Sequence, residues 1–228
     1  DDDYGLDDIE MGVTLGVAVD AGIMNFGDSA RAIALINEVG QGTTLGRILG
    51  EGVAVTARAF GISRVPVIKG QAVPAHDPRV ENGTGVTYCT SPMSDHTAGA
   101  VLFRQETPAE AVKASRQVQV NVAMVDSLGL CYIAFIERAY PMEEVTEVVN
   151  AQCGLDLSYE DMRERGKAVL KEERAFNLNA GFAPSADRLP EFFKEEPLPP
   201  SNFVFHVPDP EIDQALKAAS TFNIHVPA

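Results

Sequence analysis

Apolar residues recur every three or four positions over several long stretches of this chain, and this spacing constrains the fold more than any other feature. Residues 29–39 place Ile33, Ile36 and Val39 at helical intervals, and residues 9–20 and 45–60 are typical of two further helices. Glycines follow the ends of these segments at positions 40, 42 and 61, as expected where a helix stops. The pattern predicts a chain built mainly from α-helices.

The second half of the chain continues the helical pattern. Residues 109–126, 143–151, 158–176 and 211–219 predict four more helices, and Ser158 begins the third of these with a capping box in which Asp161 replaces Glu or Gln. Valines at 118, 120 and 122 alternate as in a strand, but the length of their segment favours a helix. Residues 80–100 are rich in Gly, Thr and Ser without a period, and we expect a loop there that could carry a site.

A change in amino-acid composition divides the chain. Pro66, Gly70, Pro74 and Pro78 fall within a short span and indicate irregular structure between two helical regions. We therefore expect a mainly α, multihelical fold of two all-α subdomains, with residues 1–66 in the first and residues 67–228 in the second.

Charge and apolar content exclude several classes of protein. Apolar residues make up 45% of the 228 residues, enough to bury a core, and the net charge is −15. Because an acidic surface repels phosphate and anionic lipid, we expect no nucleic-acid partner and no membrane partner. The most apolar stretch, residues 11–26, is too short and too polar to cross a bilayer.

The cysteines and the first residues suggest the context of the chain. Three cysteines, an odd number, argue against a disulfide framework and for a reducing, cytoplasmic location. No CxxC pair is present, so this chain alone is not expected to build a complete cysteine metal site. The start at Asp1, without a methionine, suggests a fragment.

One six-residue frame occurs twice. Residues 2–7 read DDYGLD and residues 126–131 read DSLGLC, so each copy has a carboxylate, a glycine that permits close backbone approach, and a final residue able to bind a ligand. Two such elements could hold two related halves of one ligand. Two unrelated turns that share Gly-Leu, a common dipeptide, would give the same letters.

The paired frame resembles the two pterin-contacting motifs of the aldehyde ferredoxin oxidoreductase family. Further segments agree, in the family's order: KGQAVPAHDPR at residues 69–79, GVTYCTS at 85–91, ERAFN at 173–177 and DRLP at 187–190. Each is weak alone, and together they are specific. The resemblance covers most of the chain, from residue 2 to residue 190.

This resemblance implies two multihelical domains that follow an N-terminal β-rich domain. It also implies a tungsten- or molybdenum-bis-pterin centre beside a 4Fe-4S iron–sulfur cluster. The enzyme would oxidise a small aldehyde to a carboxylic acid and pass electrons to a ferredoxin-like acceptor. Three cluster cysteines and most of the pterin-binding saddle would lie upstream of this chain, so the isolated fragment would be inactive.

The resemblance also implies roles for individual residues. Cys131 would be the fourth thiolate ligand of the cluster, since thiolate suits iron, although a small buried hydrophobic role is the ordinary alternative for a cysteine. Asp2 and Asp126 would accept hydrogen bonds from the N–H groups of the two pterins, where helix capping is the alternative. Leu6, Asp7 and Tyr132 would add nearby contacts, with Tyr132 acting through its backbone.

His96 matches the family histidine placed near the metal. There it could donate a hydrogen bond and help to move a proton, with its pKa tuned by Asp95, although a surface loop histidine is the alternative. The sequence departs from some relatives near this histidine. Basic residues that meet pterin phosphates there are replaced by uncharged ones at Pro92, Met93, Thr97 and Ala98.

Two other functions remain open from the residues alone. The chain could be a non-catalytic helical domain for assembly, including a possible homodimer through an apolar docking face. Alternatively, a hydrolase could hold a divalent metal with His76, Asp77, Asp95 and His96, provided that the two His–Asp pairs converge. Cys89 and Cys153 match no motif and are expected to be buried packing residues.

Overall fold

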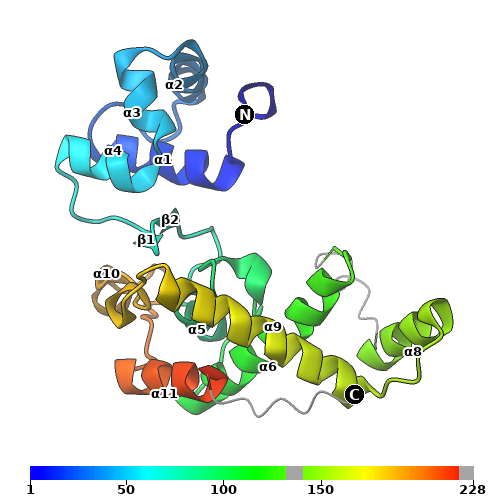
Figure 1. Cartoon of the computed structure of the whole chain (residues 1–228). Helices are drawn as coiled ribbons and strands as arrows, with labels where there is room; N and C mark the ends of the chain where they lie inside the picture. Colours follow the sequence, from blue (N-terminus) through cyan, green and yellow to red (C-terminus); the bar gives the residue numbers. More distant parts are fainter. Residues whose placement is uncertain (132–140, 221–228) are drawn as a thin grey trace.

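The structure is a computed structural model that describes residues 1–131 and 141–220, apart from the side chains of the last three. Helices dominate it and the only sheet among the described residues is a two-stranded hairpin, which confirms the predicted mainly α class (Figure 1). None of the described helices has both the length and the apolar character needed to cross a bilayer. The elements are α1 Asp8–Asp20, α2 Ser29–Gln41, α3 Thr44–Gly50, α4 Val53–Phe60, β1 Val67–Ile68, β2 Gln71–Ala72, α5 Asn82–Thr90, α6 Pro108–Ser127, α8 Met142–Cys153, α9 Tyr159–Asn179, α10 Phe192–Glu195 and α11 Asp209–Ser220.

Helices α1 to α4 form one group, drawn in blue to cyan in Figure 1. The helices predicted at 9–20 and 29–39 are present as α1 and α2. The single helix predicted over 45–60 is wrong, because two short helices, α3 and α4, occupy this segment. Gly52 separates them with a φ of 84°, a left-handed conformation that no helix interior adopts.

The hairpin β1–β2 connects this group to the rest of the chain. Its strands pair antiparallel, with Val67 opposite Ala72. Ala72 belongs to the core between α1 and α4, and Val67 packs against that core. Ile68 and Val73, which alternate with them along the chain, belong to the core of the second group. Because neighbouring residues of a strand point to opposite faces, one short hairpin contributes side chains to both cores. The division of the chain at residue 66 stays a prediction.

The second group is built around α5, where the sequence predicted a loop. That prediction is wrong for residues 82–90, since they form a helix in which residues 82–89 are all buried. A helix covered on every side has no polar face, so its apolar residues follow no period. Its glycines allow close packing: a Cβ at Gly83 would lie 2.8 Å from the Cβ of Val101, and one at Gly85 would lie 2.5 Å from the Phe205 ring.

Two long helices, α6 and α9, pack against each other beside α5 (Figure 1). Both begin with a complete capping box, formed by Thr107 with Glu110 in α6 and by Ser158 with Asp161 in α9. Gly166 lets the pair approach closely, because a Cβ there would lie 2.5 Å from the carbonyl oxygen of Val120. The helices predicted at 109–126, 143–151, 158–176 and 211–219 are confirmed as α6, α8, α9 and α11.

Candidate functional site

The two copies of the repeated frame adopt the same backbone turn. In the first copy the N–H of Gly5 donates to the carbonyl of Asp2 at 3.1 Å, and in the second the N–H of Gly129 donates to the carbonyl of Asp126 at 2.9 Å. Both glycines lie in the left-handed region, with φ of 66° and 68°. A side chain would be strained at either position, which explains why the frame requires glycine.

The leucine after each glycine forms an equivalent backbone hydrogen bond in the two copies. The N–H of Leu6 donates to the carbonyl of Asp1 at 3.3 Å, and the N–H of Leu130 donates to the carbonyl of Val125 at 3.1 Å. Each bond runs from the leucine to the residue just before the aspartate. The same pair of bonds around a left-handed glycine also follows other helices of this chain, at Gly22, Gly42 and Gly61, so the turn itself is an ordinary helix C-cap. What distinguishes the two copies is the aspartate before each glycine and the final Asp7 or Cys131.

The two turns belong to different elements of secondary structure. The first follows a short 3-10 turn, Asp2–Tyr4, and precedes α1, while the second ends α6. Asp2, Asp126 and Cys131 are all exposed. No atom lies within 4 Å of the position that a Cβ would take at Gly5 or Gly129. The turns therefore present carboxylates and a thiol to open space, where a ligand can approach the backbone.

The remaining residues predicted for this site differ in their surroundings. Asp7 caps α1, because its carboxylate accepts a hydrogen bond from the N–H of Glu10 at 2.7 Å. Leu6 is half-buried beside it. Tyr132 lies outside the described residues.

A pocket of about 290 Å³ opens beside the second turn, and we call it the α6–α9 pocket. It lies between the loop after α5 and the two long helices. Two carboxyl groups, Asp126 and Glu173, contribute to its wall together with the uncharged Pro92, Met93, Thr97 and Ala98. Its lining is Pro92, Met93, Thr97, Ala98, Gln119, Val122, Ala123, Asp126, Ser127, Val169, Leu170 and Glu173.

The environment of the pocket makes its two carboxyl groups harder to ionise. Partial burial raises the pKa of Asp126 above its usual value, although much of the side chain still faces water. Burial also raises the pKa of Glu173, and the negative charge of Asp126 raises it further. The sequence did not predict Glu173 as a site residue, because only its place in the ERAFN segment was visible.

His96 begins a 3-10 turn, His96–Ala98, in the loop after α5, and it is mostly buried. Its Nδ1 lies 2.7 Å from Oδ1 of Asp95, close enough for an ion pair when the ring is protonated, although the contact does not have hydrogen-bond geometry. Burial would raise the pKa of Asp95, but His96 and the N–H of Thr97 outweigh it and keep this pKa below its usual value. Thr97 and Ala98, directly after His96, line the α6–α9 pocket.

The residues suggested for a metal hydrolase are only partly brought together. The rings of His76 and His96 lie 4.9 Å apart, centroid to centroid. The carboxylate of Asp77, however, is held by Arg79 at 2.6 Å, and Nδ1 of His76 faces Glu81 at 3.2 Å. Over residues 1–131 and 141–220, no group of three or more His, Cys, Asp or Glu side chains is arranged to hold a metal ion. Asp77 is therefore not a metal ligand here, and this hypothesis has no site in the described part of the chain.

The cysteines also have separate surroundings. Cys89 is buried as predicted, and burial raises the pKa of its thiol to about 11. Cys153 is exposed, so its predicted burial is wrong, because it is the last residue of α8. Cys131 is exposed directly after the second turn.

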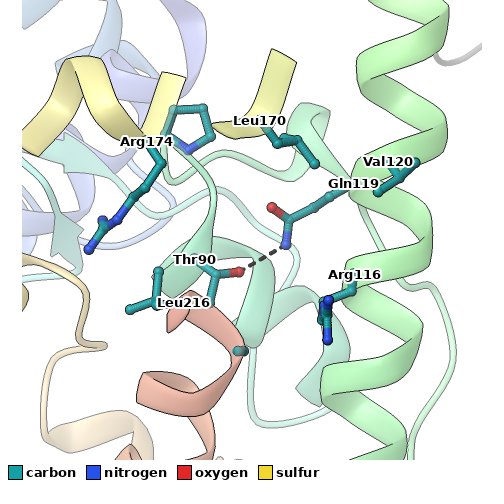
Figure 2. Close-up of a pocket in the computed structure, with 9 residues that line it drawn as sticks. Thr90, Arg116, Gln119, Val120, Leu170, Arg174 and Leu216 are labelled. Carbon is teal, nitrogen blue, oxygen red and sulfur yellow. Dashed lines mark hydrogen bonds between the residues drawn. The ribbon is translucent and has the colours of Figure 1, made fainter. Parts of the chain in front are cut away.

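A second, smaller cavity lies where α5, α6, α9 and α11 meet. Figure 2 shows Gln119 donating to the hydroxyl of Thr90 across it, at 2.9 Å, with Arg174 and Arg116 on either side. Its volume of about 30 Å³ has room for roughly one water molecule. We therefore assign this cavity to the packing of the helices and not to a ligand.

Comparison with known proteins decides the family. Residues 1–219 match the family described as "Aldehyde ferredoxin oxidoreductase, domains 2 & 3". The chain belongs to this family. The predicted resemblance is confirmed, and with it the assignment to an oxidoreductase family with helical domains.

Curated relatives in the aldehyde ferredoxin oxidoreductase family share moderate identity with the chain. It is 30% identical to the "Tungsten-containing aldehyde ferredoxin oxidoreductase" of Pyrococcus horikoshii and 30% to the protein of the same name from Pyrococcus abyssi. The namesake from Pyrococcus furiosus is 27% identical. Each alignment covers 87% of this chain and 37% of the relative, so the chain spans a little over a third of their length.

Proposed function

We propose that this chain forms the helical part of an enzyme that oxidises aldehydes to carboxylic acids at a tungsten- or molybdenum-bis-pterin centre. Electrons would pass through a 4Fe-4S cluster to a ferredoxin-like acceptor. The observation that carries the proposal is that the turns at residues 2–7 and 126–131 each expose an aspartate, and the second also exposes Cys131, which suits a ligand with two similar halves beside an iron–sulfur cluster. The names of the tungsten-containing relatives support it.

The residues at the turns fit the proposed cofactors. Asp2 and Asp126 offer carboxylate oxygens, which accept hydrogen bonds and so suit the N–H-rich edge of a pterin. The exposed sulfur of Cys131 follows the second turn without a break and suits an iron ligand. When bound, the metal–pterin group would supply the two-electron oxidation and the transfer of oxygen.

The protein would supply orientation and proton handling. His96 would exchange a proton through Nε2, because its Nδ1 faces Asp95. Asp7 would contribute through the carboxylate oxygen that its capping bond leaves available, and Leu6 through its contact surface. The α6–α9 pocket is lined by uncharged residues and two carboxyl groups, so it offers no cation to a phosphate, and we place any phosphate contacts on other parts of the protein.

The partners follow from the same proposal. They are a small aldehyde and a ferredoxin-like protein in the cytoplasm, with a homodimer as a further possibility. The absence of nucleic-acid and membrane partners stays a prediction from the charge of −15. The isolated 228 residues should be inactive, because one cluster ligand does not hold four irons.

Elemental analysis of the full-length protein tests the proposal. We expect tungsten or molybdenum together with iron in the purified protein. Cys131→Ser should lower the iron content severalfold, because the hydroxyl is a poor iron ligand. Cys153→Ser is a matched control, since Cys153 is also exposed, and it should retain the iron.

A full-length protein without tungsten, molybdenum and iron would contradict the enzyme and favour the non-catalytic helical domain. Equal iron in the two serine variants would contradict the role of Cys131 alone.

A further inference from the structure

Three of the family segments meet at one buried ion network. Lys69 from the KG segment, Arg174 from ERAFN and Asp187 from DRLP have side chains that are 2%, 12% and 0% exposed. Nζ of Lys69 lies 3.1 Å from Oδ1 of Asp187, and Nη1 of Arg174 donates to the same oxygen at 3.0 Å. A second contact joins Nη2 of Arg174 to Oδ2 at 2.7 Å. One carboxylate therefore lies between two cations.

Lys69 extends this network to the end of α5 and the loop that follows. Its Nζ donates to the carbonyl oxygens of Cys89 at 2.8 Å and Tyr88 at 3.3 Å. It also donates to the hydroxyl of Ser94 at 3.0 Å. Ser94 is 2% exposed and lies two residues before His96.

The backbone is strained at both ends of the Lys69–Ser94 contact. Lys69 has a φ of 51° and Ser94 a φ of 58°, in the left-handed region that side chains disfavour. Such conformations persist where the surrounding bonds impose them, and they are common at functional sites. At Ser94 these bonds come from Lys69 and from the hydroxyl of Ser91, which accepts from the Ser94 N–H at 3.1 Å.

Helix α9 holds the same loop a second time. Asn177, also from ERAFN, donates its Nδ2 to the carbonyl of Pro92 at 2.9 Å. Arg174 and Asn177 are three residues apart and so lie on one side of the helix. The ERAFN segment thus contacts the histidine loop directly through Asn177 and indirectly through Arg174, Asp187 and Lys69.

We propose that Lys69, Asp187 and Arg174 are positioning residues, which hold Ser94 and with it the loop of His96 in the conformation needed for proton exchange. This inference rests on the proposed function, because it gives His96 its task. All three side chains are almost completely buried, so we infer that they act through the loop.

The charge count makes this network costly to bury, because one anion faces two cations. Burial lowers the pKa of Lys69, and the carboxylate of Asp187 only partly offsets it. A buried pair of one cation and one anion would cost less to desolvate than two cations with one anion. The second cation is Lys69, which also donates to Ser94. The free-energy cost of burying Lys69 is therefore linked to the position of the loop.

This count also identifies a variant that should fold. Lys69→Met keeps most of the length of the side chain and leaves Arg174 paired one-to-one with Asp187. Asp187→Asn would leave two buried cations without their anion, so it is the poorer test.

Hydrogen exchange and kinetics on the full-length protein test the network. In Lys69→Met, amides in the peptide that contains residues 91–99 should exchange about tenfold faster or more, because local opening then lacks its main restraint. The kcat for aldehyde oxidation should fall by about tenfold with KM nearly unchanged, since His96 is displaced while substrate binding is not. Lys194→Met is the matched control, because Lys194 forms a more exposed pair with Asp209, and it should change neither value.

A second variant, Ser94→Gly, tests the same network if Lys69→Met does not fold. Glycine relieves the strain at φ 58° but removes the hydroxyl, so the protein should remain stable while the loop exchanges faster and kcat falls. Unchanged exchange in both variants, or faster exchange with unchanged kcat, would overturn the proposal.

A separate experiment tests the proposed function. If His96→Gln leaves kcat unchanged, or the protein lacks the metals, His96 loses its task, whereas the exchange rates still report whether Lys69 holds the loop.

Discussion

At the scale of single residues, the fold around the α6–α9 pocket raises the pKa of its two carboxyl groups. Asp126 and Glu173 come from different helices and line one wall. Because burial and their mutual repulsion raise the pKa of Glu173, the folded state binds its proton more tightly than the unfolded chain does. The stabilising effect of that proton is complete below the ordinary glutamate pKa of about 4.3 and is lost as pH rises through the higher folded value.

Glu173→Gln should therefore stabilise the chain at pH 7 and leave it unchanged at pH 4. The gain should stay below about 1 kcal/mol, because the carboxyl group is partly open to solvent. Thermal unfolding at the two pH values measures it. Glu172→Gln, which removes the same charge from the exposed neighbouring residue, is the control; an equal gain there would mean that net charge, not the pocket, is responsible.

The sequence predicted part of this site. It identified Asp126 and Cys131 through a frame of adjacent residues, whose geometry a local turn sets. It did not indicate that Glu173 lies near Asp126 or that the rings of His76 and His96 lie together, because those contacts depend on how separate elements pack. The surroundings of Lys69 were likewise invisible, although its segment was recognised.

At the scale of elements, helices with a polar face could be predicted and helices without one could not. The amphipathic α2 and the capped α9 follow spacing and capping rules that a sequence displays. Helix α5 does not, because burial of all its faces removes the period. The break between α3 and α4 was missed because Gly50 and Gly52 leave the apolar spacing of 45–60 intact while φ at Gly52 interrupts the helix.

The packing of α6 on α9 gives a prediction about glycine. Gly166→Ala should cost about 1–3 kcal/mol, since the new Cβ would meet the carbonyl oxygen of Val120 at 2.5 Å and force the helices apart. Gly16→Ala in α1 is a matched change, with no atom within 4 Å of its Cβ, and it should stabilise the chain by about 0.5–1 kcal/mol. Urea unfolding of both variants measures these values, and a stabilising Gly166→Ala would show that the helices are not in close contact.

At the scale of the whole molecule, the hairpin connects the two groups of helices, and one carboxylate fixes the hairpin to the first group. Glu10 of α1 accepts from the N–H of Val53 at 2.8 Å and from the N–H of Ala72 at 2.8 Å. It therefore links α1 to the start of α4 and to β2. Since Ala72 belongs to the first core and Val73 to the second, this link lies where the cores meet.

Glu10→Gln should destabilise the chain by about 1–3 kcal/mol, because one acceptor oxygen becomes an amide that faces a backbone N–H. Urea unfolding followed by circular dichroism measures the loss. Glu51→Gln, at an exposed position just after α3, should change stability little, and equal effects of the two variants would contradict the linking role of Glu10.

The complete enclosure of α5 has a consequence for the history of this chain. A helix with an outward face can accept new side chains there, but residues 82–89 have no such face, and Gly83 and Gly85 leave no room for growth. Random substitutions should be rejected in this segment more often than in any amphipathic helix of the molecule. In distant relatives of this protein, the small residues of α5 should therefore change more slowly than the apolar residues of the other helices.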